Sequence, residues 1–391
     1  MFHADVNAAI APNVSTVVFA YNKYYLGSKS LGPTSEWEIM WRESAKSVFG
    51  TSMVEYCPDL GSDPSDDTTS NNLNELFSVG HSSLLIMVYY SQDCSGADFI
   101  SLETLRGLKK RGVRVAAIWG DVQNPHQRAM MRRLRGLVDL NICTASYAAA
   151  KRLADKLPIL YSWVPVQDEP IQPCDCGALL GYGGSPKTDR LKTLTFLERR
   201  GISIHTGGGE GPRVQNRQSY RTLLAHPLSL SFNRSGFESV SNARVFETLR
   251  QGSCLVDEAS RETSRFLSPW FDFVPWKGNS DLLRILQRLR DNPESAKAIG
   301  TRGHRTSLRW RDELLRESVL IAIDSTVNSD RFKKVHGNSF FVTDESTLLS
   351  DFVGWALEQS TFERIITSGQ MLRSNFRTLS HYYEQKIRLE Q

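Results

Sequence analysis

The chain has 391 residues, with 47 lysines and arginines against 43 aspartates and glutamates, a formal charge of +4 and 40% hydrophobic residues. This length exceeds what one hydrophobic core usually organises, so two domains are expected. The mildly basic charge suits a phosphate-bearing small molecule or a membrane surface, and it is too small to indicate nucleic-acid binding.

The six cysteines do not form a disulfide framework in a chain of this size. Cys174 and Cys176 lack the nearby Cys or His partners that zinc would need, so we expect reduced thiols throughout. The longest apolar run, Leu84 to Tyr90, is far shorter than the ~20 residues of a membrane helix, and the amino terminus has no signal-peptide pattern. We expect a cytoplasmic protein, at most peripherally bound to the inner face of a membrane.

The first half of the chain alternates strands with helices. The apolar run Ser83–Tyr90 is continuous, as expected for a parallel strand covered on both faces. The other predicted elements are, in order, strand Val14–Ala20, helix Ser35–Phe49, helix Ala97–Arg111, strand Val113–Trp119, helix Pro125–Gly136, strand Val138–Cys143, helix Tyr147–Leu157 and strand Ile159–Trp163. Such alternation implies right-handed βαβ units and a parallel sheet with helices on both faces.

The proline-rich segment Pro165–Pro173 interrupts the alternation, and the second half then restarts it. Its predicted elements are strand Ala178–Tyr182, helix Leu191–Arg200, strand Ile202–Thr206, helix Ser219–Ala225, strand Leu228–Phe232, helix Ser241–Arg250, strands Cys254–Val256 and Phe271–Val274, and helices Ser280–Arg290 and Pro293–Arg309. We predict Rossmann-like domains over residues 1–165 and 174–323, and a mostly helical extension over residues 324–391 that packs back on the first domain. Two such domains leave a cleft between the carboxyl ends of their strands, where these folds bind ligands.

Four segments of the second half together resemble the donor domain of a GT-B glycosyltransferase. They read L-L-G-Y-G-G-S-P-K-T-D-R, L-E-R-R-G-I-S-I-H-T-G-G-G, A-H-P-L-S-L-S-F-N and N-A-R-V-F-E-T-L-R-Q-G-S-C-L-V-D-E. The resemblance covers Ala178–Arg309 and is closest to the spore-maturation-type (CgeB-like) branch of the group 1 enzymes. It implies an α/β fold of two doubly wound Rossmann-like domains.

The resemblance also implies an activity. Such an enzyme moves a hexosyl group from a nucleotide sugar, such as a UDP-sugar, to a glycan, lipid-linked or small-molecule acceptor, as in polysaccharide biosynthesis. It implies no cofactor and no metal, so arginines and helix N-termini must neutralise the charge that grows on the leaving phosphate.

The resemblance assigns the diphosphate site by position. Gly184 and Ser185 would let the backbone approach the diphosphate, and Arg190 and Arg244 would pair with its oxygens. These residues follow predicted strands or begin predicted helices, where unpaired backbone N–H groups bind phosphate.

It likewise assigns the sugar side of the nucleotide. Asn233 and Arg234 would line the loop after a strand, and Glu247 would accept hydrogen bonds from the ribose hydroxyls. Many retaining members have a second glutamate, but here Ser239 occupies that position and Glu238 lies one residue off. Retention therefore does not follow from the sequence.

The residues alone leave an alternative for Arg244 and Glu247. On a helical wheel they share a face with Thr248 and Gln251, opposite Val245 and Leu249. They could thus be a solvated pair on a helix surface, worth only a few tenths of a kcal/mol.

Candidates for the acceptor side come from the first half. Asp121, after a predicted strand, could deprotonate an acceptor hydroxyl, with His126 nearby; alternatively Asp121 caps a helix and His126 is a surface residue. The basic helix segment Arg128–Arg135 could contact an anionic membrane or be an ordinary solvated face. His205 and Gly207–Gly209 fit a tight turn or a ligand loop.

Two other functions compete with sugar transfer. A nucleotide-sugar epimerase on the same fold would turn over the donor without an acceptor. A non-catalytic binding module would keep the fold and lose the chemistry.

Overall fold

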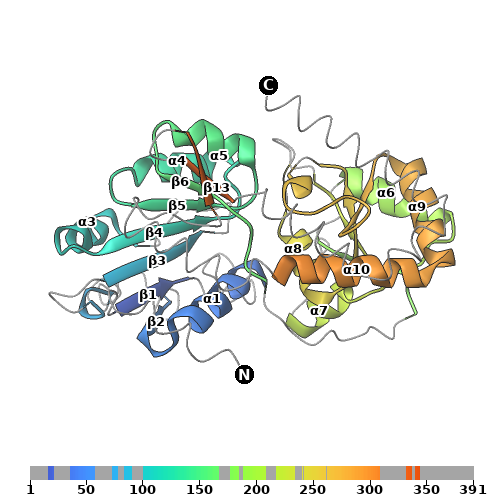
Figure 1. Cartoon of the computed structure of the whole chain (residues 1–391), viewed down its shortest axis with the longest axis horizontal. Helices are drawn as coiled ribbons and strands as arrows, with labels where there is room; N and C mark the ends of the chain where they lie inside the picture. The colour runs from blue at the N-terminus through green and yellow to red at the C-terminus, as the bar shows by residue number, and fades with distance from the viewer. Residues whose placement is uncertain are drawn as a thin grey trace.

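The computed structural model describes residues 16–21, 36–57, 73–77, 83–89, 100–166, 177–184, 188–207, 217–233, 240, 242–260, 262–308, 332–336 and 340–343. In these residues the chain forms two α/β domains that lie side by side (Figure 1). Each domain is built on its own parallel sheet, as the alternation of apolar runs and helices predicts.

The N-terminal sheet has the strand order β12-β13-β6-β5-β4-β3-β1-β2 within the described residues. Its strands are β1 (Thr16–Ala20), β2 (Met53–Tyr56), β3 (Ser83–Tyr89), β4 (Arg114–Trp119), β5 (Leu140–Cys143), β6 (Ile159–Tyr161), β12 (Phe332–His336) and β13 (Phe340–Thr343). All neighbouring pairs are parallel except β12 and β13. The helices are α1 (Glu36–Phe49), α3 (Leu102–Lys110), α4 (Pro125–Arg133) and α5 (Tyr147–Ala154).

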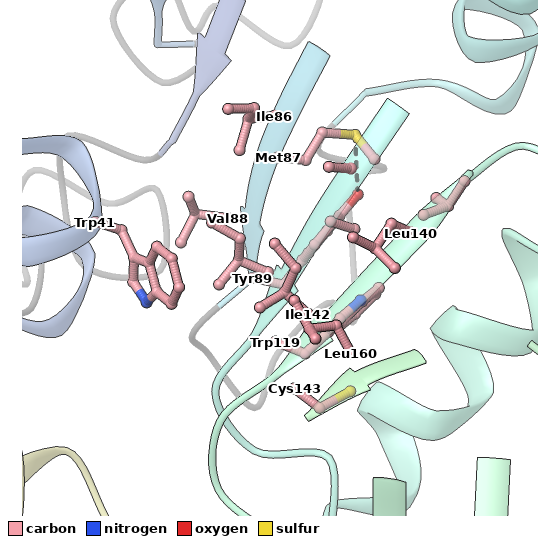
Figure 2. Packing of buried hydrophobic residues seen from close by; sticks show 14 of the residues in the cluster. Trp41, Ile86, Met87, Val88, Tyr89, Trp119, Leu140, Ile142, Cys143 and Leu160 are labelled. Carbon is pink, nitrogen blue, oxygen red and sulfur yellow. Dashed lines mark hydrogen bonds between the residues drawn. The ribbon is translucent and has the colours of Figure 1, made fainter. Parts of the chain in front are cut away.

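Helices cover this sheet on both faces. Right-handed crossovers place α1, between β1 and β2, on one face and α3, α4 and α5 on the other. Every residue of β3 is buried, as its continuous apolar sequence predicts. Figure 2 shows Trp41 of α1 turned toward Val88, and the rings of Tyr89 and Trp119 stack with centroids 4.4 Å apart.

Two strands differ from the sequence prediction. β2, with the sequence M-V-E-Y, was not predicted, because a short edge strand that is only partly buried has no continuous apolar run. β11 begins three residues later than the predicted strand Phe271–Val274, since Phe271 and Asp272 form a turn ahead of it. In the predicted helical extension over residues 324–391, the described residues are strands, and β13 pairs with β6 of the N-terminal sheet.

The C-terminal sheet is parallel, with the order β11-β10-β9-β7-β8 in the described residues. Its strands are β7 (Leu180–Gly183), β8 (Ile204–Gly207), β9 (Leu228–Ser231), β10 (Cys254–Glu258) and β11 (Val274–Trp276). Its helices are α6 (Thr188–Arg199), α7 (Arg217–Leu224), α8 (Ala243–Gln251), α9 (Asn279–Asp291) and α10 (Pro293–Leu308), with the short 3₁₀ turn η6 at Thr263–Arg265.

Apolar side chains join the two domains. The core of the N-terminal domain continues into Phe246 of α8 and Phe266 beyond η6. The ring of Trp163, which follows β6, packs edge-on against both, with centroids 4.4 Å from Phe246 and 4.7 Å from Phe266. Because Trp163 is fully buried, α8 belongs to an interface rather than to a free surface.

Buried ion pairs also cross between the domains. Glu36, at the start of α1, is bound by Arg221 of α7 at 2.7 Å and by Arg250 of α8 at 3.1 Å. Arg250 is fully buried and also binds Glu43 at 2.7 Å. Glu43 lies about two turns after Glu36 in α1. Figure 1 shows α1 at the side of the N-terminal domain that faces the C-terminal domain, and these ion pairs join it to α7 and α8.

Several sequence expectations concern single residues. Cys57, Cys143 and Cys254, the cysteines among the described residues, are free thiols. Cys174 and Cys176 lie outside the described residues. Among the helices that the structure describes, none combines the length and apolarity needed to cross a membrane.

A histidine pair ties β8 to the turn after α7. Nδ1 of His205 and Nε2 of His226 are 2.8 Å apart, and Nδ1 of His226 lies 3.1 Å from the carbonyl oxygen of Ala178. His226 is fully buried, and its burial lowers its pKa, with His205 acting in the same direction. His205 therefore packs from within strand β8 rather than from a turn, and Gly208 and Gly209 of the predicted turn or ligand loop lie outside the described residues.

We expect this pair to make the protein less stable in mild acid. A histidine whose folded pKa is lowered binds fewer protons when folded, so stability is present above the unfolded pKa of about 6.5 and is lost as pH falls toward the folded pKa. His226→Gln should flatten this dependence in urea unfolding series at decreasing pH. The exposed His126 supplies the matched control, His126→Gln, which should leave the slope unchanged.

Candidate functional site

The predicted site residues of the C-terminal domain gather where β7 and β9 end and α8 begins. Gly184 directly follows β7, and the first turn of α8 carries Arg244. In a parallel sheet these carboxyl ends lie at one edge, facing the amino ends of the helices that follow. This arrangement exposes helix N–H groups and positive side chains to the same region.

Arg244 lies directly against Gly184. A Cβ built at Gly184 would come 2.2 Å from Nη2 of Arg244, and the φ angle of this glycine is 150°, so no other residue fits the position well. The guanidinium also lies 5.6 Å from the ring centroid of Tyr182. Gly184 thus provides the space that the arginine occupies.

Arg190, in the first turn of α6, contacts a second buried aromatic ring near the end of the sheet. Its guanidinium is 5.8 Å from the ring centroid of Phe232, and the rings of Phe232 and Tyr182 meet edge to face at 5.5 Å. Arg190 and Arg244 therefore flank two buried rings at the end of the sheet. Guanidinium groups are well suited to bind an anion such as a diphosphate.

Asn242 caps helix α8, and the sequence prediction did not single it out. Its side-chain oxygen accepts a hydrogen bond from the backbone N–H of Arg244 at 2.9 Å, and its amide nitrogen donates to the carbonyl oxygen of Phe232 at 2.6 Å. These bonds fix the start of α8 to the end of β9. Asn before an amphipathic run is a recognised N-cap pattern and could have indicated this role.

Glu247 is buried in the second turn of α8, with a side chain that accepts a hydrogen bond from the phenol of Tyr220 at 2.7 Å. Burial raises the pKa of Glu247 to about 7, while the Tyr220 hydrogen bond and the charge of Arg244 act to lower it. The interpretation of Arg244 and Glu247 as a solvated pair is therefore wrong for Glu247. α1 and α7 cover this helix, which a wheel drawn for α8 alone does not include.

Asn233 is buried, and its side chain makes hydrogen bonds within the C-terminal domain. Its amide nitrogen donates to Oδ2 of Asp257 at 2.5 Å, to the carbonyl oxygen of Glu258 at 2.7 Å and to the hydroxyl of Thr263 at 3.2 Å. Burial raises the pKa of Asp257 to about 6. The carbonyl oxygen of Asn233 also accepts from the backbone N–H of Val240 at 2.9 Å.

Four residues of the sequence hypothesis lie outside the described residues. They are Ser185 and Arg234 of the predicted nucleotide site, and Glu238 and Ser239 at the position of the second glutamate.

The acceptor-side candidates lie in the N-terminal domain. Asp121 follows β4 and is half-buried, and its Oδ1 accepts a hydrogen bond from Gln123 at 2.9 Å. The cap of α4 is Asn124, which accepts from the backbone N–H of His126, so the helix-cap interpretation of Asp121 is wrong. The side chain of His126 is exposed. The structure therefore groups Gly184, Arg190, Arg244 and Glu247 in one domain and holds Asp121 and His126 in the other.

The basic segment of α4 is largely exposed, as expected for either interpretation of it, with Arg132, Arg133 and Arg135 on the surface. Among the described residues, no three His, Cys, Asp or Glu side chains come together as a metal site would require.

Comparison with known proteins gives the fold and one family match. Residues 190–311 match the model of a family described as glycosyl transferase-like, which overlaps the segment where the sequence resemblance lies. No curated protein sequence matches the chain.

Two solved structures are similar to this chain over most of its length. HepE from Anabaena, solved in complex with UDP-glucose, has a TM-score of 0.50 at 10% identity, over 79% of this chain and 99% of its own. The apo structure of OtsA has a TM-score of 0.51 at 9% identity, over 80% of this chain and 100% of its own. At such low identity the likeness establishes the fold alone. The chain is therefore a two-domain protein of the GT-B fold whose C-terminal domain matches a glycosyl transferase-like family.

Proposed function

We propose that the protein is a glycosyltransferase that moves a hexosyl group from a nucleotide sugar to an acceptor hydroxyl. The observation that carries this proposal is the cluster of Gly184, Arg244 and Glu247 at the carboxyl end of the C-terminal sheet. It combines a guanidinium seated against a glycine at the end of β7 with a buried carboxylate on the same helix, groups that suit the diphosphate and the hydroxyls of a nucleotide.

In this proposal Arg190 and Arg244 bind the diphosphate together with the start of α8. As the glycosidic bond breaks, negative charge grows on the leaving phosphate, and fixed cations with helix N–H groups stabilise it without needing a metal. Glu247 accepts hydrogen bonds from the ribose hydroxyls. Ser185, Asn233 and Arg234 complete the predicted donor side, with Asn233 held in place by its hydrogen bond to Asp257.

The acceptor would bind on the N-terminal domain, with Asp121 as the base that takes the hydroxyl proton and His126 nearby. A UDP-sugar is the donor we favour, because HepE, which shares the fold, was solved with UDP-glucose. We further propose the spore-maturation-type branch, a glycan, lipid-linked or small-molecule acceptor, a role in polysaccharide biosynthesis, and a peripheral membrane contact through the exposed arginines of α4.

Replacing Glu247 with alanine should weaken nucleotide binding about tenfold or more, because hydrogen bonds to a charged group contribute about 1.5–3 kcal/mol. Calorimetric titration with UDP, GDP and ADP and their sugar conjugates measures the change. Glu198→Ala, which removes an exposed glutamate of α6 in the same domain, should bind like the wild type. Equal affinity of the Glu247→Ala variant for every ligand that the wild type binds would contradict the assignment.

The same ligands separate the competing activities. Transfer requires an acceptor, whereas an epimerase would convert the nucleotide sugar alone. A binding module would retain the nucleotide and change neither compound.

A further inference from the structure

We propose that Tyr220 is a positioning residue of the nucleotide site, which holds the Glu247 carboxylate in the orientation and charge state that ribose binding needs. This inference rests on the proposed function, because it assigns a task to a residue that acts through Glu247.

The position of Tyr220 is fixed by packing as well as by its hydrogen bond. Its ring lies on the backbone of Gly183, where an added Cβ would come 2.8 Å from Cε2 of Tyr220. The next residue, Gly184, holds the guanidinium of Arg244 in the same way. Gly183, which ends β7, and Gly184, which follows it, therefore lie against two side chains that both influence Glu247.

Tyr220 donates its phenolic proton to Oε2 of Glu247 at 2.7 Å. This bond fixes one of the two oxygens of the carboxylate. With one oxygen fixed by Tyr220, the other oxygen has a defined direction in which to accept a hydroxyl. An ionised carboxylate offers only acceptors, whereas a protonated one carries a donor that competes with the ribose hydroxyls.

Charged and titratable groups from three helices surround this carboxylate. Tyr220 comes from α7, Arg244 and Arg250 from α8, and Glu36 from α1. Burial and Glu36 favour the protonated form, and the other three groups favour the ionised form. Because burial raises the pKa of Glu247 to about 7 even with the Tyr220 hydrogen bond in place, removing the phenol should raise this pKa further and leave Glu247 protonated at neutral pH.

The test measures the affinity for a nucleotide sugar from about pH 6 to about pH 9 in the wild type and in Tyr220→Phe. UDP-glucose is a suitable first probe, because its diphosphate does not titrate in this range. The wild type should bind more tightly as pH rises through about 7, where Glu247 ionises. Tyr220→Phe should bind about tenfold more weakly near neutral pH and recover part of this loss at high pH, since each unit of pKa shift is a tenfold change in the ionised fraction.

Tyr89→Phe is the matched control. Tyr89 is a buried tyrosine of the N-terminal core whose phenol donates to the sulfur of Met87 at 3.8 Å (Figure 2), so its replacement removes the same oxygen away from α8. It should leave both the affinity and its pH midpoint unchanged. Melting temperatures of both variants show whether each remains folded.

Glu247→Gln separates positioning from simple packing. If Tyr220 acts through the carboxylate, Tyr220→Phe should weaken binding in the native background and have much less effect in the Glu247→Gln background. Equal effects in both backgrounds, or an unchanged pH midpoint in Tyr220→Phe, would overturn the inference while leaving the proposed function intact. A wild-type protein that binds no nucleotide sugar of the panel would contradict both.

Discussion

Gly181→Ala should destabilise the C-terminal domain by several kcal/mol. Among the described glycines of this domain, it is the one at which an added Cβ would come nearest to another atom. A Cβ at this position in β7 would lie 1.8 Å from the carbonyl oxygen of Leu223 and 2.8 Å from the ring of His226. A backbone carbonyl at the end of α7 cannot turn away as a flexible side chain can, so β7 and α7 must separate. Urea unfolding measures the lost stability.

The same substitution should also weaken nucleotide binding, because α7 carries Tyr220 and any shift of this helix moves the phenol away from Glu247. Gly107→Ala is the control. Gly107 lies within α3, where an added Cβ meets nothing within 4 Å, and alanine in a helix should stabilise the protein by about 0.5–1 kcal/mol. A Gly181→Ala variant as stable as the wild type would show that α7 does not pack this closely on β7.

Arg250→Met should reduce the free energy of unfolding by about 3 kcal/mol, because it breaks a buried ion pair from one side. Arg250 is fully buried and binds both Glu36 and Glu43 of α1. Methionine fills much of the same volume, and Glu36 keeps Arg221, but both carboxylates lose a cation, and Glu36 loses it in a buried place. Urea unfolding followed by circular dichroism gives the change.

The comparison for Arg250→Met is an arginine in an exposed ion pair. Arg284 of α9 binds Asp281 at 2.7 Å, but its side chain is 69% exposed, so Arg284→Met should cost less than about 1 kcal/mol. If the two variants were equally stable, the contact between α1 and α8 would contribute no more than a surface pair. A loss confined to Arg250→Met would show that the buried ion pairs between α8 and α1 stabilise the folded protein.

Much of the fold followed from the sequence because its signals are local. The continuous apolar sequence of β3 indicated a strand covered on both faces, and the structure buries all of it. α8 was expected to end near Gly252, and this glycine has the left-handed φ of 72° that ends many helices. Elements with a weak local pattern, such as the edge strand β2, could not be recognised in this way.

The site was predicted less completely because its environment is not local. Glu247 was assigned from a resemblance, and the residue that holds it, Tyr220, comes from another helix 27 residues earlier. The sequence of α8 alone is compatible with a solvated polar face. In the structure α1 contacts α8 through Glu36 and Glu43, which lie 214 and 207 residues before Arg250. Periodicity reports which face of a helix is apolar, but not which helix of a distant segment will cover its polar face.

The return of the chain to the first domain has a consequence for synthesis on the ribosome. β13 pairs in parallel with β6, although all strands of the second domain lie between them in the sequence. Until residues 340–343 emerge, β6 is the outer strand of the nascent N-terminal sheet and presents unpaired backbone groups to neighbouring chains. The first domain therefore completes its sheet only after the second has been made, and aggregation of the nascent chain competes with that last pairing step.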